Sequence, residues 1–269
     1  MSKVVKPRSR PKAPPPFCVV VASNDEACLR QNLMASEMVG KGGLPVHVER
    51  GAASAALAYN RGINATDAPI IIFAHQDVYF PPGWEQRLVE AIARLEKQDP
   101  NWALLAPFGV AANGDLVGPV WSSSLGRIVG HAPNGCKPVQ SFDELVIILR
   151  RDSGLCFDPD LPGFHMYGTD IVQTARARGL GAYATALPLV HNDAFHDNLH
   201  ADFARAYHYM RKKWRRVLPL RSSVLSISRH GLNLPLQQLL MRTSYGKRQA
   251  IAQDTSRPPQ HYSAICDWE

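Results

Sequence analysis

Short apolar runs recur along the first part of the chain, and each is followed by a segment of mixed polarity. Residues 17–22, 69–74 and 102–108 are apolar at nearly every position, and 45–49 is a shorter run with two valines. Continuous apolar runs of this length are typical of strands that are buried on both faces. The pattern therefore predicts four strands.

Amphipathic segments lie between these runs. A helical pattern covers residues 25–38, small residues fill a second predicted helix at 52–65, and Trp84, Leu88, Ile92 and Leu95 repeat at near-helical spacing. Strands that alternate with helices in this order indicate βαβ units. We therefore expect an α/β fold with a single, mostly parallel sheet flanked by helices.

The rest of the chain is less regular. Residues 110–145 are rich in Gly, Ser, Pro and Asn and predict loops with short strands. An apolar segment follows at 145–149, a helix is predicted at 170–178, and a late strand is predicted at 186–190. Beyond residue 200 the pattern becomes helical and basic, so we expect a C-terminal helical extension.

The formal net charge of +7 is unevenly distributed. Residues 1–16 have five basic and no acidic residues, 17–199 have 13 basic and 19 acidic residues, and 200–269 have 12 basic and four acidic residues. The Pro-rich basic start cannot bury a core. We predict a disordered leader at 1–16, an α/β domain at 17–199 and a basic, mainly helical extension at 200–269.

This distribution argues against a nucleic-acid enzyme, because such enzymes carry their positive field around the active site. A protein that binds nucleic acid through its two basic ends remains an alternative. The cluster Arg211–Arg216, which includes Trp214, has two interpretations. It is either a solvated helix face or a peripheral contact with an anionic membrane surface.

The cysteine pattern and the N-terminus bear on location. The chain has five cysteines, an odd number, and they are widely spaced without a C-x-x-C pair. The N-terminus lacks the apolar stretch of a signal peptide, and no window approaches the roughly 20 apolar residues of a membrane span. We expect a cytoplasmic protein, with the inner membrane surface as the site of any peripheral contact.

Three polar clusters follow apolar segments: 75–77 (HQD), 165–170 (HMYGTD) and 191–193 (HND). In α/β sheets, ligands bind beyond the carboxyl ends of the strands, where Asp77 is expected. An Asp at one strand end and a His at another can bind Mg²⁺ or Mn²⁺. Asp170 is then a candidate general base.

Two segments together resemble a known family. Residues 58–84 (AYNRGINATDAPIIIFAHQDVYFPPGW) and 161–192 (LPGFHMYGTDIVQTARARGLGAYATALPLVHN) resemble glycosyltransferases with the GT-A fold. The nearest resemblance is to bacterial family 2-like members in which the metal motif reads HQDV, as it does at 75–78. The resemblance spans roughly residues 17–195.

The resemblance implies a metal-dependent transfer of a sugar from a nucleotide-diphosphate donor to a hydroxyl on a glycan, a lipid-linked or a protein acceptor. It assigns Asp77 and His191 to the cation, Mn²⁺ or Mg²⁺. Asp170 corresponds to the acidic residue that serves as base in inverting members. The resemblance identifies neither the donor base nor the acceptor.

The remaining residues that the resemblance assigns surround the donor. Those expected to contact the nucleotide, its ribose or its phosphates are Ala22, Ser23, Asn24, Glu49, Asn60, Arg61, His75 and Gln76. His75 stands where many members have a carboxylate, and a neutral imidazole there would bond the ribose instead.

Other functions stay open at this point. A non-catalytic module that binds nucleotide or glycan would keep the same fold. His191, His196 and His200 are an alternative zinc set, although no H-E-x-x-H motif is present. Trp121 either stacks on a sugar or packs in the core.

Overall fold

A computed structural model describes residues 16–41 and 43–269 of the chain. The predicted disordered leader at 1–16 lies, except for its last residue, outside the described residues. The first element, strand β1 (Phe17–Ser23), begins where the first apolar run does.

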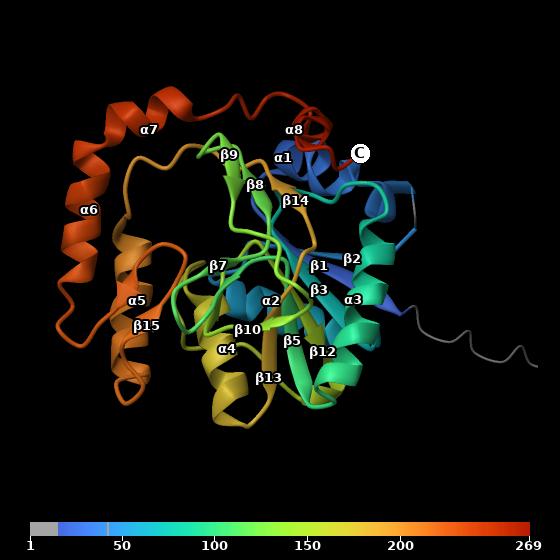
Figure 1. Ribbon diagram of the computed structural model, residues 1–269, viewed down its shortest axis with the longest axis horizontal. Coiled ribbons are helices and arrows are strands. Elements are labelled where there is room, and N and C mark those ends of the chain that lie inside the picture. Colours follow the sequence, from blue (N-terminus) through green and yellow to red (C-terminus); the bar gives the residue numbers. More distant parts are fainter. Residues whose placement is uncertain (1–15, 42) are drawn as a thin grey trace, which may run out of the picture.

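A seven-stranded sheet forms the centre of the molecule, with the strand order β10-β13-β5-β12-β3-β1-β2 (Figure 1). Besides β1, its strands are β2 (Val46–Arg50), β3 (Ile70–Ala74), β5 (Trp102–Ala106), β10 (Lys137–Pro138), β12 (Val146–Arg150) and β13 (Gly181–Ala184). The pairings make β1, β2, β3, β5 and β13 run in one direction. The mostly parallel sheet that the sequence predicts is therefore confirmed.

Two strands run against the others. β12 lies antiparallel between β3 and β5, and β10 lies antiparallel to β13 at the edge. The apolar segment at 145–149 indicated a buried strand but not its direction, because a strand covered on both faces is apolar whichever way it runs. Strand β13 was not predicted.

Helices cover both faces of the sheet. On one face α2 (Ala55–Ala65) and α4 (Tyr167–Ala177) pack with Val20, and on the other α3 (Trp84–Gln98) packs with Val19. Adjacent residues of β1 enter opposite cores because successive side chains of a strand point to opposite faces. The sheet is therefore buried on both sides.

The first predicted helix is divided. α1 (Glu26–Gln31) is followed by a short 3₁₀ turn, η1 (Leu33–Ala35), and a π-helical turn, η2 (Glu37–Lys41). The side-chain amide of Asn32 donates to the carbonyl of Cys28 at 3.0 Å. Such a local bond competes with the hydrogen bonds of the helix. α1 therefore ends at Gln31, although the apolar pattern of the sequence continues beyond it.

Three smaller sheets lie outside the central sheet. The first contains β4 (Val78–Tyr79), β14 (Leu189–His191), β8 (Val120–Ser122) and β9 (Arg127–Val129). The second contains β6 (Gly109–Val110), β7 (Leu116–Val117) and β11 (Ser141–Phe142). The third pairs β15 (Leu220–Arg221) with β16 (Ser226–Ile227). The late strand predicted at 186–190 is thus β14, which pairs outside the central sheet. A short turn, η3 (Arg151–Ser153), follows β12.

The C-terminal extension is mainly helical, as predicted, with α5 (Ala201–Lys213), α6 (Asn233–Thr243), α7 (Tyr245–Ile251) and α8 (Pro259–Ile265). The side chains of α5 join the core on the α2 side of the sheet, whereas α6 contributes only Leu234 to it. α8 returns to the region of β14 and α1 (Figure 1). Within the described ranges, no helix combines the length and apolar character that a membrane crossing requires.

Candidate metal and nucleotide site

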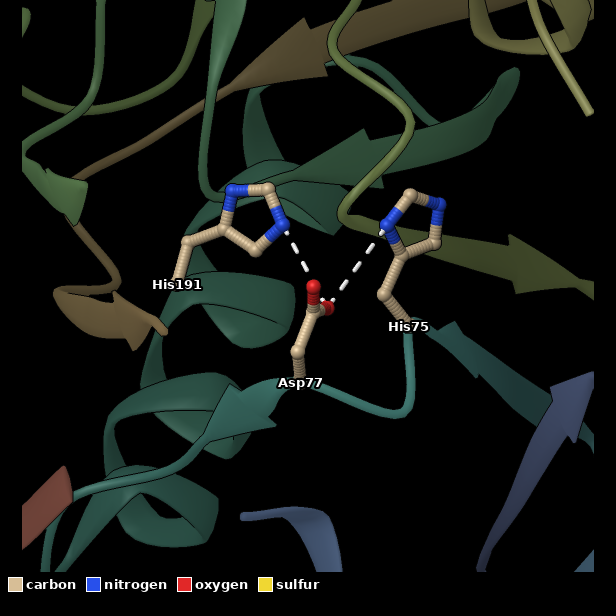
Figure 2. Close-up of side chains that lie close together, drawn as sticks. All are labelled: His75, Asp77 and His191. Atoms are coloured by element: carbon tan, nitrogen blue, oxygen red, sulfur yellow. Dashed lines mark ion pairs between the residues drawn. The ribbon is translucent and has the colours of Figure 1, made fainter. Parts of the chain in front are cut away.

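Three side chains with metal-ligand atoms meet at the carboxyl end of β3. One atom each from His75, Asp77 and His191 lies within 4.8 Å of the other two. Asp77 Oδ1 is 3.4 Å from His191 Nε2 and 3.9 Å from His75 Nδ1. Figure 2 shows the carboxylate of Asp77 between the two imidazole rings. No other such group is found among the described residues.

Strand pairing brings these residues together across more than a hundred positions of sequence. His75 follows β3, and its backbone N–H donates to Leu145 at 2.9 Å. β4, which begins directly after Asp77, pairs with β14 so that His191 lies opposite Val78. The N–H of the next residue, Asn192, donates to the carbonyl of Asp77 at 2.8 Å. Both chain segments are therefore fixed by backbone bonds.

Tyr167, the first residue of α4, determines how His75 faces the cluster. The Tyr167 hydroxyl donates to the carbonyl of Glu144 at 2.9 Å and lies 2.7 Å from His75 Nε2. Because that hydroxyl has one proton and a carbonyl can only accept, His75 Nε2 must donate its own proton to the tyrosine oxygen. The lone pair of His75 is then on Nδ1, the atom that faces Asp77.

Asp193 lies behind His191 and is held by a short serine sequence. Its carboxylate accepts from the hydroxyls of Ser122 and Ser124 and from the backbone N–H of Ser124. Asp193 Oδ1 is 3.9 Å from His191 Nδ1, so Asp193 acts on that ring through its charge. The two carboxylates Asp77 and Asp193 thus lie near opposite nitrogens of His191.

The electrostatics follow from this arrangement. Burial alone would lower the pKa of His191, but the charges of Asp77 and Asp193 outweigh burial and raise it to about 10. Burial raises the pKa of Asp77, yet the charges of His191 and His75 and the hydrogen bonds to Asp77 together outweigh burial, so the net pKa is lowered. Burial lowers the pKa of His75 despite the neighbouring Asp77. The site therefore holds an anionic Asp77 beside one neutral imidazole.

The three residues fit a divalent cation. Two imidazoles and one carboxylate are ligands that first-row divalent metals accept. Asp77 Oδ1 is buried and has no hydrogen-bond partner among the described residues. A buried carboxylate oxygen without a partner is costly, and a cation would satisfy it. Because a metal-ligating His must be neutral, metal binding would release a proton from His191.

Glu144 is a second buried acid near this edge, beside Tyr167. Its Oε1 accepts from the backbone N–H of Gly168 at 3.2 Å. Burial is the largest cause that raises its pKa to about 8, and the adjacent Asp143 raises it further. Glu144 therefore titrates near neutral pH without being a member of the ligand cluster.

Four residues of the predicted nucleotide site lie together at the ends of β1 and β3. Gln76 Oε1 accepts from the Ser23 hydroxyl and from the N–H groups of Asn24 and Asp25, at 2.9–3.1 Å, while its Nε2 donates to Asn24 Oδ1. Ala22 precedes them on β1. Gln76 thus fixes the backbone between β1 and α1, where Asp25 caps the helix.

Glu49 and Arg61 also meet, whereas Asn60 lies elsewhere. Glu49 is paired with Ala22 in the sheet and accepts from His47 at 2.6 Å; Arg61, whose side chain is 59% exposed, is 3.5 Å from its other oxygen. Asn60 exchanges two hydrogen bonds with the backbone of Phe157. Its side chain therefore joins α2 to the segment between η3 and α4 and is not directed toward Glu49.

Asp170 is placed apart from the ligand cluster. It lies in the first turn of α4 and is 2% exposed. Trp214 Nε1 donates to its Oδ1 at 2.7 Å, and Lys213 Nζ contacts both oxygens at 2.7 and 2.8 Å. Burial raises the pKa of Asp170, and these two partners offset that only in part. The contacts are those of a buried anchor between α4 and α5, and the base role stays a prediction.

Two further alternatives are decided by local contacts. Trp121 is 8% exposed and stacks on Tyr262 of α8 with ring centroids 5.3 Å apart, so its face is packed. His200 bonds Asp197, and no zinc-type group that includes His196 and His200 occurs among the described residues. Packing is the observed role of Trp121.

Sequence reasoning missed Tyr167, Glu144 and the serines that hold Asp193. The serine run at 122–124 follows a Trp in a loop-rich region, and nothing in its local pattern indicates a site. Tyr167 lies inside the polar cluster at 165–170, where the acidic residue drew the prediction instead. Their roles depend on contacts with segments far away in sequence.

The fold and this cluster together define an α/β protein with a candidate divalent-metal site at the carboxyl edge of its parallel strands. No protein-family model matches the chain. A protein of Fuscovulum blasticum described as "ATP synthase subunits region ORF 6" is 32% identical over 159 residues. The match covers 55% of this chain and 61% of that protein, so the chain spans about three fifths of its relative.

Solved structures with a similar chain path include a mannosyltransferase and proteins crystallised with UDP or UDP-GlcNAc. GalNAc-T7 with UDP, GalNAc and Mn²⁺ has a TM-score of 0.47 and 11% identity, over 96% of this chain and 58% of its own. The mannosyltransferase PcManGT from Pyrobaculum calidifontis with GDP-Man and Mn²⁺ has a TM-score of 0.45 and 13% identity, and the match covers 96% of this chain and 81% of that protein. TarS of S. aureus with UDP-GlcNAc has a TM-score of 0.46 and 12% identity, and the match covers 73% of this chain and 64% of TarS. At TM-scores below 0.5, the chemistry must be argued from the site itself.

Proposed function

We propose that this protein is a metal-dependent glycosyltransferase that moves a sugar from a nucleotide-diphosphate donor to an acceptor hydroxyl. The observation that carries the proposal is the cluster of His75, Asp77 and His191 at the carboxyl edge of the sheet. In α/β sheets this edge is where ligands bind. The end of β1 at residues 22–24 lies at the same edge and offers a second contact region beside the cluster.

The donor atoms favour Mn²⁺ over Mg²⁺ as the cation. Mg²⁺ prefers a shell of oxygen ligands, whereas two imidazoles suit first-row transition ions better. When bound, such a cation neutralises negative charge on a diphosphate. Tyr167 would support it indirectly, since it holds the proton of His75 on Nε2 and leaves the Nδ1 lone pair toward Asp77.

The donor nucleotide would lie along β1 and β2. The backbone at 22–24, held in place by Gln76, offers a fixed surface for a nucleoside. Glu49 lies near the end of β2, and the exposed Arg61 beside it supplies positive charge for a phosphate. We propose no contact for Asn60, because both ends of its amide are bonded to Phe157.

The role of Asp170 separates two versions of this proposal. For an inverting enzyme, Asp170 would take the proton of the acceptor hydroxyl. That role requires Lys213 and Trp214 to release the carboxylate, which both now contact. The same observation favours a second candidate function, a module that binds the nucleotide or a glycan without transferring sugar.

Metal-dependent nucleotide binding is the first test. Isothermal titration should give a site for Mn²⁺, and thermal shift with UDP, GDP and dTDP should show one nucleotide that stabilises the protein only when Mn²⁺ is present. Asp77→Asn should lose both effects, while Asp67→Asn, an exposed acid before β3, should keep both. Absence of any Mn²⁺-dependent nucleotide effect would refute the proposal.

Turnover then distinguishes the enzyme from the binding module. With the matching nucleotide sugar, an enzyme releases nucleoside diphosphate slowly even onto water, and faster with a glycan, lipid-linked or protein acceptor. A binding module gives the Mn²⁺-dependent thermal shift without release.

We also propose a cytoplasmic location, at the inner membrane surface, which is consistent with five unpaired cysteines.

A further inference from the structure

The C-terminal extension has an unusual charge distribution. Between Asp202 and Asp254 the sequence contains eleven Lys and Arg residues and no acidic residue. Lys213 is neutralised by Asp158 and Asp170 of the α/β domain. No ion pair with a described acid is found for Lys212, Arg215, Arg216 or Arg229. Positive charge is therefore left uncompensated at this surface.

Much of this charge surrounds one hollow at the end of α5. The hollow has a volume of about 570 Å³ and is lined by His208, Arg211, Lys212, Arg215, Arg216, Leu218 and Arg229. Arg211 is held in place, because its guanidinium donates to the carbonyls of Ser228 and Arg229 at 3.1 and 2.7 Å. We call this feature the basic hollow. Its basic side chains can donate to an anionic oxygen.

The neighbouring helix α6 exposes its apolar face. Leu232, Leu236, Leu239 and Leu240 are 69%, 55%, 57% and 51% exposed. Their spacing of i, i+4, i+7 and i+8 places them on one side of the helix. We call these four residues the leucine stripe. Exposed apolar patches of this kind mark sites that are covered by a partner.

The opposite side of α6 is attached to the protein, so this orientation is fixed. Leu234 is 4% exposed, Asn233 donates to the carbonyl of Ser226 at 2.7 Å, and Gln238 donates to the carbonyl of Leu199 at 2.8 Å. A helix that packed for its own stability would bury its leucines and expose its amides. In α6 only Leu234 is buried, while the leucine stripe is exposed and two amide side chains face the protein.

The basic hollow and the leucine stripe are adjacent. Arg229 lines the hollow and precedes Leu232 by three residues, and Arg211 of α5 contacts the carbonyl of Arg229. Figure 1 shows α5 and α6 both at the edge of the molecule opposite α3. The apolar surface continues on α7, where Tyr245 and Ile251 are 42% and 48% exposed.

A single partner must account for both features. Nucleic acid would neutralise the hollow but leave four leucines in water. A second copy of this chain would cover the leucines but bring two basic hollows toward each other. An anionic lipid bilayer presents phosphates at its surface and apolar chains beneath them, so it complements both.

We propose that this surface docks onto an anionic lipid bilayer. The basic hollow receives headgroup phosphates, and the leucine stripe of α6 enters the boundary between headgroups and acyl chains. The predicted contact through Arg211–Arg216 thus gains an apolar counterpart on α6. The inference does not depend on the proposed transferase activity, because it concerns a different surface.

Vesicle co-sedimentation of the full chain tests the proposal. The protein should sediment with phosphatidylcholine vesicles that contain phosphatidylglycerol and stay in solution with pure phosphatidylcholine. Raising the salt to about 1 M should weaken binding, because the screening length falls to about 3 Å. Equal binding to both vesicle types, or to neither, would overturn the proposal.

Two sets of variants separate the contributions. Arg215→Gln, Arg216→Gln and Arg229→Gln combined should weaken binding by about 100-fold, at about 1 kcal/mol for each basic residue near an anionic surface. Leu236→Gln, Leu239→Gln and Leu240→Gln combined should weaken it at least about tenfold, because apolar burial is lost. Circular dichroism should show unchanged helix content, since all three leucines are exposed.

A matched control and two competing outcomes complete the design. Val89→Gln with Arg94→Gln removes one exposed apolar and one exposed basic residue from α3 and should bind vesicles like the parent. If the parent binds duplex oligonucleotide and not vesicles, and only the basic variants lose this binding, the partner is nucleic acid. If the leucine variants convert a dimer into a monomer in light scattering without affecting vesicles, the partner is a second copy.

Discussion

Charged side chains behave differently in the two main regions of this protein. At the carboxyl edge of the sheet, His75, Asp77, His191 and Asp193 are close together and largely withdrawn from water. On the C-terminal extension, the basic residues around the hollow face solvent without acidic partners. We propose that the first region binds a small cation and the second an extended anionic surface.

Net charge alone is therefore a poor guide to the function of this protein. The +7 of the whole chain belongs mainly to its ends, whereas the chemistry that we propose depends on one carboxylate and two imidazoles. Asp170 and Lys213 connect the two regions through a buried ion pair. Substitutions can therefore show whether the regions act separately.

The largest effect is expected at Asp77. Asp77→Asn removes the only carboxylate of the cluster among the described residues and should lower Mn²⁺ affinity by more than about 100-fold, the upper end for loss of a supporting residue. Vesicle binding should be unchanged. Titration calorimetry measures the first and sedimentation the second. Undiminished Mn²⁺ affinity would mean that the cluster is not a metal site.

The next effect is expected for the connection between the regions. Asp170→Asn leaves Lys213 with Asp158 as its only described acidic partner and should lower the free energy of unfolding by about 2–4 kcal/mol. If Asp170 acts only as this buried anchor, turnover per folded molecule is retained. Denaturation in urea measures stability, and Asp202→Asn, on the surface of α5, is the control. A loss of turnover of about 100-fold or more at unchanged stability would instead identify Asp170 as the base.

Within the site, Tyr167 is expected to have an intermediate effect. Tyr167→Phe frees His75 Nε2 and should lower Mn²⁺ affinity by about 10–100-fold, as loss of a supporting hydrogen bond does. Tyr59→Phe is the matched control, because the Tyr59 hydroxyl is 3.4 Å from that of Tyr167 and has no bond to His75. The same loss in both variants would assign the effect to packing rather than to His75.

The smallest effect concerns pH and Glu144. Burial raises the pKa of Glu144 from 4.5 to about 8 in the folded protein, so the folded state binds this proton more tightly than the unfolded state. Its stabilising contribution is complete below pH 4.5 and is lost as the pH rises toward 8.

Glu144→Gln should therefore remove this decline in the free energy of unfolding over the same pH window. Urea denaturation at several pH values measures the slope. Glu96→Gln, at an exposed position of α3, should keep the slope of the parent. A parent protein whose stability rises over the same window would contradict the assignment.

Much of the fold followed from local pattern. The apolar runs at 17–22, 69–74 and 102–108 correspond to β1, β3 and β5, because a doubly covered strand has no polar face. The helix α3 followed from apolar spacing. The direction of β12 and the existence of β13 did not follow, since GAYA is short and small, and an apolar run carries no sign of direction.

The candidate site was predicted in part for the same reason. Asp77 and Gln76 follow a strand whose end was recognisable, and Gln76 bonds Ser23 and Asn24, while the binding roles of these residues stay predictions. The contacts of Asn60 could not be predicted from local sequence, because its neighbour in space, Phe157, is 97 residues away. The contacts of Asp170 could not be predicted either, because Lys213 and Trp214 come from the C-terminal extension.

The sequence by itself determined the α/β alternation, the uneven charge and the residue types available at each strand end. These depend on neighbours in the chain, whose spacing repeats with the period of a helix or strand. Only the tertiary structure decided that β4 pairs with β14 and brings His191 to Asp77, that Tyr167 selects the tautomer of His75, and that α6 presents its leucines outward. These features depend on contacts between distant segments, which no local pattern records.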